Sequence, residues 1–323
     1  MKRNIYILAV LLCLQVLLVF VPGMGSRQEA VTGKSERLVV FRPEEVGKIE
    51  ISGPEKGRVV IVKKANEWFL PDHSDFPADG KMVREFLEKL DSLDAGWPVA
   101  TTSGAAERFK VSPDNFERHI ILYKGDETVA ELFLGTSPGV RKIHARTGGS
   151  DNIYEVKFTL FQAADDPDQW IDKNVLRIEE PAITGIRLPG ITLERVGSGF
   201  APDDLGANET VVDTEVRGLV KKVARLTIDG VLGTTQPEGF SSDSPDLEYV
   251  VVTEPGGVEH RFVFKKPEEG AYYILKTSDR PEYFKVAEWQ VNGISGVKRG
   301  QLVKRADRPQ TGKGDETGSG LSE

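Results

Sequence analysis

The sequence predicts an α+β protein in which a single N-terminal transmembrane helix precedes two tandem copies of a helix-on-antiparallel-sheet unit. Three observations predict this architecture. The chain opens with an uncharged apolar stretch, two amphipathic segments about 130 residues apart repeat one spacing of apolar residues, and similar series of strands follow both segments.

The apolar stretch Ile5–Val21 holds seventeen residues without a charge, directly behind Lys2 and Arg3. At about 1.5 Å per residue, a helix of this length reaches ~25 Å, close to the thickness of a hydrocarbon core. A cleaved signal peptide is the alternative, but residues 23–25 (Gly-Met-Gly) match the small-residue cleavage pattern poorly. We therefore interpret residues 1–26 as a transmembrane anchor, an uncleaved signal anchor.

The two cations before the stretch favour a cytoplasmic N-terminus, because basic tails are retained on that side. We therefore expect a single-pass protein of the cell inner membrane, with the bulk of the chain in the periplasm. Residues 27–45 form a polar linker.

Two segments have the pattern of a helix with one apolar face. In each, apolar residues follow the first one at spacings of 3, 4, 7 and 10, as a period of 3.6 requires. Asp79 and Asp213 are the expected N-caps. The apolar residues are Val83, Phe86, Leu87, Leu90 and Leu93 in residues 78–94, and Val216, Leu219, Val220, Val223 and Leu226 in the second segment.

The segments around these helices also correspond. Short strands are expected before each helix, then a hairpin, and then a strand–turn–strand stretch of thirteen residues. The strands before the helices are residues 48–51, 58–62 and 68–70, and residues 185–188 and 191–196. The hairpins are residues 119–134 and 249–264, and the stretches are 144–156 and 274–286. We interpret residues 46–181 and 182–304 as two α+β repeats, and residues 157–170 could add a helix between them.

The composition excludes several classes of function. Only Lys2 and Arg3 are charged among the first 26 residues, so the net charge of −8 for the whole chain becomes −10 for the rest. An acidic domain argues against nucleic-acid binding. Cys13 is the only cysteine and lies inside the apolar stretch, so the domain has no disulfide and no thiolate chemistry. Residues 305–323 are polar and rich in Gly, and we expect a disordered tail.

One string resembles a catalytic motif. Residues 135–139 (Gly-Thr-Ser-Pro-Gly) spell the G-x-S-x-G pattern of a nucleophile elbow. An elbow needs a strand, a turn and a helix, whereas this string joins two expected strands. Pro138 also lacks the backbone N–H that the residue after the nucleophile must donate to an oxyanion. A Gly/Pro turn is the better interpretation, and we expect no catalytic role for Ser137.

The remaining candidates also favour structural roles. The four histidines, His73, His119, His144 and His260, have no metal-ligand spacing. The aspartates form two groups, Asp72, Asp75 and Asp79, and Asp165, Asp166 and Asp168; both are typical of polar loops and helix ends. The basic residues Lys298, Arg299, Lys304 and Arg305 are interpreted as a solvated tail, with an acidic partner as the alternative. The sequence therefore predicts no catalytic, metal-binding or cofactor-binding residues, and no cofactor.

Five short motifs stand out in the sequence, at residues 68–70, 108–113, 131–135, 153–156 and 170–173. Together they resemble a known bacterial family, the domain-of-unknown-function family DUF4340. Residues 110–111 (Lys-Val) replace the Gly-Leu of the family's usual Phe-Gly-Leu-x-x-Pro turn. The resemblance covers the first repeat well and the second more loosely, and it carries no catalytic set. It implies a membrane-anchored extracytoplasmic protein whose genes often lie beside ABC-type transporter genes of the gliding-motility type.

We therefore expect a non-catalytic accessory or interaction protein of a membrane complex, such as an ABC-type transport system. Its partners would be the membrane and other proteins, with no nucleic acid. The alternatives are a periplasmic module that binds a glycan, lipid or peptide, and a hydrolase. A binding module should expose clustered aromatics such as Trp97, Trp170 or Trp289, an enzyme should bring titratable groups together, and an interaction protein should expose an apolar patch.

Overall fold

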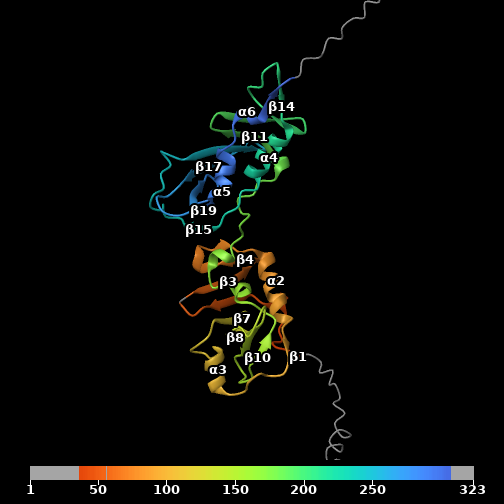
Figure 1. Cartoon of the computed structure of the whole chain (residues 1–323), viewed down its shortest axis with the longest axis vertical. Coiled ribbons are helices and arrows are strands. Elements are labelled where there is room, and N and C mark those ends of the chain that lie inside the picture. Colours follow the sequence, from red (N-terminus) through yellow and green to blue (C-terminus); the bar gives the residue numbers. More distant parts are fainter. Residues whose placement is uncertain (1–35, 56, 307–323) are drawn as a thin grey trace, which may run out of the picture. The chain divides into compact units, whose positions relative to one another are not determined.

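A computed structural model describes residues 36–55 and 57–306 (Figure 1). The expected membrane anchor, residues 1–26, lies outside the described residues, as do residues 27–35 of the linker and the segment 307–323. Within the described ranges, no helix is both long enough and apolar enough to cross a membrane.

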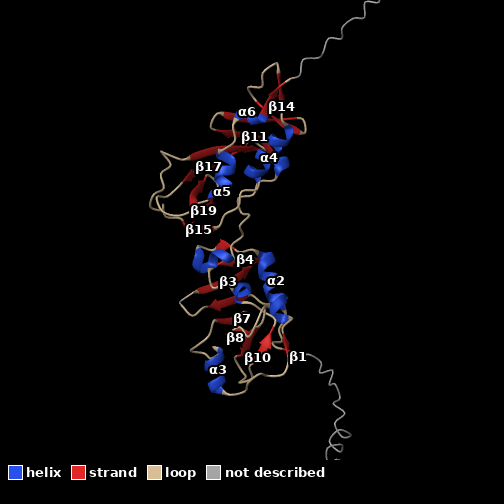
Figure 2. Cartoon of the chain, in the orientation of Figure 1, coloured by secondary structure: helices blue, strands red, loops and turns tan. Residues whose placement is uncertain are grey.

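The fold is α+β, with mostly antiparallel sheets and few helices, so the predicted class is confirmed (Figure 2). The chain divides into two compact units. Unit 1 contains the described residues up to 60 together with 81–165, and unit 2 contains residues 61–80 together with 166–306. The α-helices are α2 (Gly80–Asp91), α3 (Ser103–Phe109), α4 (Asp213–Ala224), α5 (Glu288–Ser295) and α6 (Arg299–Leu302).

The first eight-stranded sheet has the order β10-β9-β8-β7-β2-β3-β4-β5. Its central strand β2 carries Ile49 and Ile51, both fully buried, opposite Leu122 and Ile120 of β7. The strands are β2 (Lys48–Ser52), β3 (Arg58–Lys64), β4 (Glu67–Leu70), β5 (Phe76–Pro77), β7 (Arg118–Lys124), β8 (Glu127–Leu134), β9 (Ile143–Thr147) and β10 (Tyr154–Val156).

The second eight-stranded sheet has the order β13-β12-β11-β16-β17-β18-β19-β15. Its central strand β11 pairs with β12 on one side and with β16 on the other. The strands are β11 (Ile183–Leu188), β12 (Ile191–Val196), β13 (Gly199–Pro202), β15 (Gly230–Gly233), β16 (Leu247–Thr253), β17 (Val258–Lys265), β18 (Tyr272–Thr277) and β19 (Tyr283–Ala287).

Seven strands follow one another in the same order in both sheets. A two-strand hairpin, β3–β4 or β12–β13, lies on one side of the central strand, and a four-strand meander, β7–β10 or β16–β19, lies on the other. After the helix, β6 (Asp94–Ala95) lies beside β10, and β15 pairs with β19. In unit 1, β6 also pairs with β1 (Glu36–Arg37), the first described segment of the chain.

Helix α2 buries the predicted apolar stripe, with Val83 and Leu90 fully inaccessible. The helix begins at Gly80, two residues later than predicted. Before it, the Ala78 and Asp79 amides donate to the Trp68 and Trp170 carbonyls, so residues 78–79 continue strand-like pairing. It ends at Asp91 rather than residue 94, because the next residues lead into β6.

Helix α4 buries the predicted stripe in the same way, and it lies against β13 and α5. Asp213 is its first residue and not its cap, because the preceding Val212 donates its amide to Leu302.

The helix considered for residues 157–170 does not form. Two 3₁₀ turns, Leu160–Ala163 and Pro167–Gln169, occupy this segment instead. Pro167 cannot donate a helical hydrogen bond, and the Asp166 side chain accepts from the Asp168 amide, which starts a new turn there.

The helix α2 or α4 packs on one face of each sheet. The segment that connects this helix to the four-strand meander covers the opposite face. In unit 1, Ala105 and Ala106 of α3 and Val111 of the following turn pack with Phe133 of β8 and Ile153 in a small core. In unit 2, a long loop contributes Phe240, which packs with Val263, Ile274 and Tyr283. Both sheets therefore have an apolar layer on each face at this position.

The buried stripe of α2 predicts the cost of truncating it. Leu90→Ala should lower the free energy of unfolding by about 2–5 kcal/mol, because Leu90 is fully buried and its removal leaves a cavity. Glu88→Ala, on the exposed side of the same helix, should change it by less than about 0.5 kcal/mol. Urea unfolding of the full chain measures both, and equal effects would contradict the packing described here.

Candidate functional site

A hollow of about 550 Å³ in unit 1 carries an unusual concentration of positive charge. We call it the cationic hollow. Phe158 is buried in its wall, whereas Val140 at its margin is 90% exposed. The hollow is lined by Lys89, Val140, Arg141, Lys142, Lys157, Phe158, Thr159 and Gln162.

The charges of the hollow are largely uncompensated. Lys142 forms an ion pair with Glu155. Among the described residues, no acidic side chain lies within ion-pair distance of Lys89, Arg141 or Lys157. Arg141 and Lys157 are exposed to solvent. An acidic chain thus presents a local cluster of free cations, which favours an anionic ligand.

The wall that carries Val140 and Arg141 is the loop between β8 and β9, which includes the G-x-S-x-G string. The Ser137 hydroxyl lies 2.8 Å from both the Gly139 and Lys142 carbonyl oxygens, and with its single proton it can donate to either. Arg141 has a positive φ of 57°. Ser137 is therefore a brace that shapes this loop.

Gly135 and His144 fix the base of the same loop. A Cβ at Gly135 would lie 1.9 Å from the Phe109 carbonyl oxygen, so only glycine fits. His144 is buried, its Nδ1 lies 2.9 Å from both the Oγ1 and the carbonyl oxygen of Thr136, and its ring packs 4.2 Å from the Phe109 ring. The string connects strand to strand, as predicted, and its first glycine meets a packing requirement.

The opposite wall is a tight turn after β10. Thr159 and Gln162 bond reciprocally, with the Thr159 amide donating to Gln162 Oε1 over 3.1 Å. This turn leaves the Phe161 side chain 93% exposed. The turn next to the hollow and the loop that carries Val140 therefore each expose an apolar side chain to solvent.

The hollow lies near the edge at which the chain enters unit 1. Arg37 of β1 donates to Asp91 over 2.6 Å. Asp91 is the last residue of α2 and lies two residues after Lys89. β1 pairs with β6, β6 lies beside β10, and Lys157 directly follows β10. In Figure 1, β1 and β10 lie at the same end of unit 1.

A second hollow, of about 570 Å³, lies over β11 and β12 in unit 2 and has a different charge balance. Its two arginines are engaged: Arg187 pairs with Glu259, and Arg195 donates to the Ile183 and Glu180 carbonyls. Glu194 and Glu254 add negative charge to its lining. It is therefore less suited to an anion than the cationic hollow.

The other three histidines lie apart, each with a polar partner. His73 Nε2 is 3.4 Å from Asp168, and His119 Nε2 is 2.8 Å from Glu131 while its ring stacks on Phe133. His260 Nε2 lies 2.9 Å from Thr253 Oγ1, and its Nδ1 lies 2.6 Å from Asp279. In the described part of the chain, no group of three or more His, Cys, Asp or Glu side chains is placed to hold a metal ion.

The Thr253–His260–Asp279 chain was not foreseen, because its members come from different strands and turns. It has the hydroxyl–imidazole–carboxylate order of a proton relay. Thr253, however, is only 7% exposed and its backbone pairs with Val258, which leaves the hydroxyl little access to a substrate. Its clear effect is to tie β16 and β17 to the turn after β18.

The predicted aspartates serve separate local contacts. Asp75 accepts from Lys64 over 2.6 Å, and Asp165 pairs with Arg118 at 2.7 Å. Asp166 caps a 3₁₀ turn, and Asp168 accepts from the Val231 amide. Of the three tryptophans considered for a ligand groove, Trp170 is fully buried, while Trp97 and Trp289 are 88% and 75% exposed.

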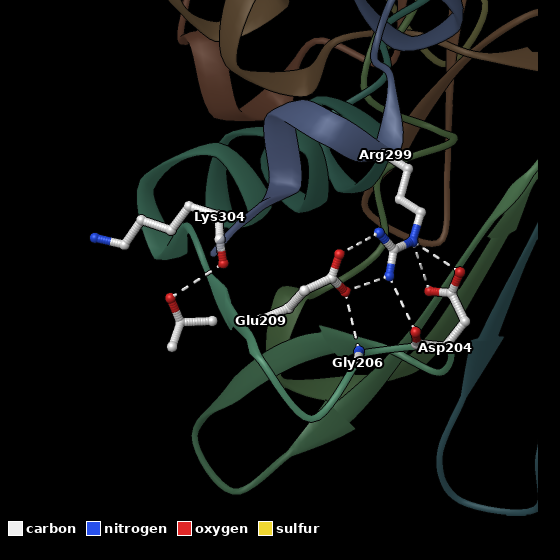
Figure 3. A network of polar contacts seen from close by, with 6 residues as sticks. Asp204, Gly206, Glu209, Arg299 and Lys304 are labelled. Carbon is white, nitrogen blue, oxygen red and sulfur yellow. Dashed lines mark hydrogen bonds and ion pairs between the residues drawn. The ribbon is translucent and has the colours of Figure 1, made fainter. Parts of the chain in front are cut away.

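The basic run at the C-terminal end is ordered and not a solvated tail. Arg299 begins α6, and Lys304 and Arg305 belong to β20 (Val303–Arg305), which pairs with β14 (Glu209–Val211). Figure 3 shows the Arg299 guanidinium between two carboxylates, at 2.7 Å from Asp204 and 2.7 Å from Glu209. Sequence patterns could not find this clamp, since its partners lie more than 80 positions apart.

The clamp changes the acidity of Glu209. The Arg299 guanidinium, followed by the Gly206 amide, lowers the pKa of Glu209 from 4.5 to about 2. Hydrogen bonds to Glu209, and next to Asp204, raise the pKa of Arg299. Because α6 and β20 end the described chain, the clamp holds that end onto unit 2.

The string 135–139 yields one prediction. Gly135→Ala should lower the free energy of unfolding by about 1–3 kcal/mol, since its methyl group would overlap the Phe109 carbonyl. Ser137→Ala should cost less, and neither the wild type nor this variant should be labelled by a fluorophosphonate probe. Labelling that disappears in Ser137→Ala would instead identify an activated serine.

The clamp yields a pH-dependent prediction. The folded-state pKa of Glu209 lies below its ordinary value, so its carboxylate stabilises the fold above about pH 4.5, and this contribution is lost as the pH falls through about 2. Glu209→Gln should lower the thermal midpoint at neutral pH and flatten its decline in that acid range. Glu268→Gln, an exposed control, should follow the wild-type profile. An unchanged acid profile in Glu209→Gln would contradict the role assigned to the clamp.

Comparison with known proteins identifies the family. No curated protein and no solved structure matched the chain. The family described as Domain of unknown function (DUF4340) matches residues 68–245, which is more than half of the chain and spans parts of both units. The resemblance seen in the short motifs is thus confirmed, and the chain belongs to the DUF4340 family.

Proposed function

We propose that this chain is a single-pass, membrane-anchored extracytoplasmic protein that acts as a non-catalytic accessory component of a membrane complex. The observation that carries the proposal is the uncharged stretch of seventeen residues at 5–21. A short polar linker joins this stretch to an acidic folded region. Two cations before the stretch and the poor cleavage pattern after it support an uncleaved anchor with the folded region in the periplasm.

The folded region supports a role in assembly over a role in catalysis. The G-x-S-x-G serine braces a loop, and the buried Thr253 offers its hydroxyl little access. Large apolar side chains are exposed in unit 1, among them Val40, Trp97, Val140 and Phe161. Where such side chains lie together, they are typical of surfaces that meet another protein or a membrane.

We also propose that the folded region arose by duplication, as residues 46–181 and 182–304, between the linker 27–45 and the tail 305–323. The shared order of seven strands and the matched apolar spacings of α2 and α4 support this. A duplicated unit would offer two related surfaces, which suits a protein that bridges partners such as the subunits of an ABC-type transport system.

The second candidate is a periplasmic module that binds a glycan, lipid or peptide. The cationic hollow favours it, because uncompensated cations beside exposed apolar side chains suit an amphiphilic anion.

Two measurements test the main proposal. Alkaline phosphatase fused after residue 306 of the full chain should be active, because this enzyme matures only outside the cytoplasm. Mass spectrometry of the purified full chain should show an intact N-terminus, and a mature N-terminus near Arg27 would contradict the anchor. Affinity capture of the full chain from detergent-solubilised membranes should then recover transporter subunits. Residues 1–35 fused to a reporter are the matched control. If this control recovers the same proteins, the folded region does not bind them and the proposed role is wrong.

A further inference from the structure

We propose that the cationic hollow of unit 1 binds the headgroup of an anionic phospholipid in the bilayer to which the chain is anchored, with Val140 and Phe161 resting in the interface beside it. This inference rests on the proposed anchor and deepens it, because it names a ligand and an orientation of unit 1 against the membrane.

The length of the connecting segment brings the hollow within reach of the bilayer. Only residues 27–35 separate the uncharged stretch and its flank from Glu36 in β1. Fully extended at about 3.5 Å per residue, this connection spans at most ~35 Å. An anchor at residues 1–26 would therefore keep the entry edge of unit 1 within ~35 Å of the bilayer.

The order of strands relates the hollow to that edge. β1 pairs with β6, with Arg37 opposite Asp94, and β6 lies beside β10. The chain leaves β10 directly into Lys157 and Phe158, which line the hollow. Lys89, on the last turn of α2, is two residues from Asp91, the ion-pair partner of Arg37. An anchor that pulls β1 towards the bilayer thus brings the same edge of the hollow with it.

The chemistry of the hollow matches a lipid phosphate better than an acidic protein surface. Arg141 and Lys157 have no ion pair within the described residues, and Thr159 adds a hydroxyl. Arginine and lysine bind phosphate oxygens through charge-assisted hydrogen bonds. Phe161 and Val140, 93% and 90% exposed, are the apolar side chains that an interface would shelter. The hollow in unit 2, which has engaged arginines and added glutamates, lacks this combination.

The braced loop makes the hollow a defined site. Ser137 holds the turn that carries Arg141, and the Thr159–Gln162 bonds hold the opposite wall. The backbone that carries the cations is therefore held in place before a headgroup binds, and the ordering cost is limited to the exposed side chains.

The test uses the full chain in vesicles of phosphatidylcholine, with and without phosphatidylglycerol, and two nitroxide positions. A label on the native Cys13 reports the anchor. A label on Phe161→Cys, in a Cys13→Ser background, reports the hollow. Collisions with oxygen and with a water-soluble nickel complex place each label in lipid or in water.

The expected result is that Cys13 lies in hydrocarbon in both vesicles, and that position 161 moves from water to the interface only with phosphatidylglycerol. Arg141→Gln with Lys157→Gln should abolish this shift. Arg84→Gln with Lys221→Gln, which removes the same charge from exposed sites elsewhere, should leave it intact. Soluble glycerol phosphate should not reproduce the shift in phosphatidylcholine vesicles, because it supplies no bilayer.

The two proposals fail in different ways. If Cys13 lies in hydrocarbon and position 161 stays in water with both lipids, the lipid site is wrong while the anchor stands. If Cys13 lies in water, the anchor is wrong, and the lipid site that depends on it falls too. A shift that persists in Arg141→Gln with Lys157→Gln also overturns the site.

Discussion

The central strand of each large sheet is the constraint on which the rest of the structure depends. β2 and β11 are flanked on both sides, by β3 and β7 and by β12 and β16. A strand in this position must satisfy its backbone N–H and C=O groups along both edges. The chain therefore builds a hairpin on one side and must return past the centre to build the meander on the other. In both sheets the amphipathic helix lies on this return path, which explains why it needs one apolar face and why a covering segment follows it.

The loops that this topology creates are held by polar contacts. In unit 1, Ser137 and His144 shape the connection between β8 and β9, and Gly135 lets it approach the end of α3. In unit 2, His260 ties a hairpin to the turn after β18, and Arg299 ties the last helix to Asp204 and Glu209. Such residues attract attention in a sequence as catalytic or ligand candidates. Their bonding partners here are mostly backbone carbonyls and neighbouring carboxylates, which is the pattern of structural contacts.

Local periodicity made part of the fold predictable. The spacing of Val83 and Leu90 predicts α2, and the two apolar runs on either side of the turn at residues 254–257 predict a hairpin, because both signals depend on neighbours within about ten residues. The start of α2 was placed too early, since pairing with the distant Trp170 captures the Asp79 amide. The clamp at Arg299 and the cationic hollow were missed for the same reason. Each gathers side chains from segments far apart in the chain, and no spacing rule joins Lys89 to Lys157 before the strands are in order.

The attachment of β1 has a mechanical consequence for the proposed anchored arrangement. A pull from the membrane side first loads a two-residue ladder, the Arg37–Asp91 ion pair and the Leu38–Leu93 hydrogen bond. Buried apolar residues between 38 and 46 and the Glu45–Lys124 ion pair then hold the segment before β2. These contacts would break one after another, beginning at the N-terminal end of β1. Each freed residue would lengthen the tether by about 3.5 Å while the eight-stranded sheet keeps its shape. The junction can thus act as a short compliant extension, which would let the folded region follow a moving partner without unfolding.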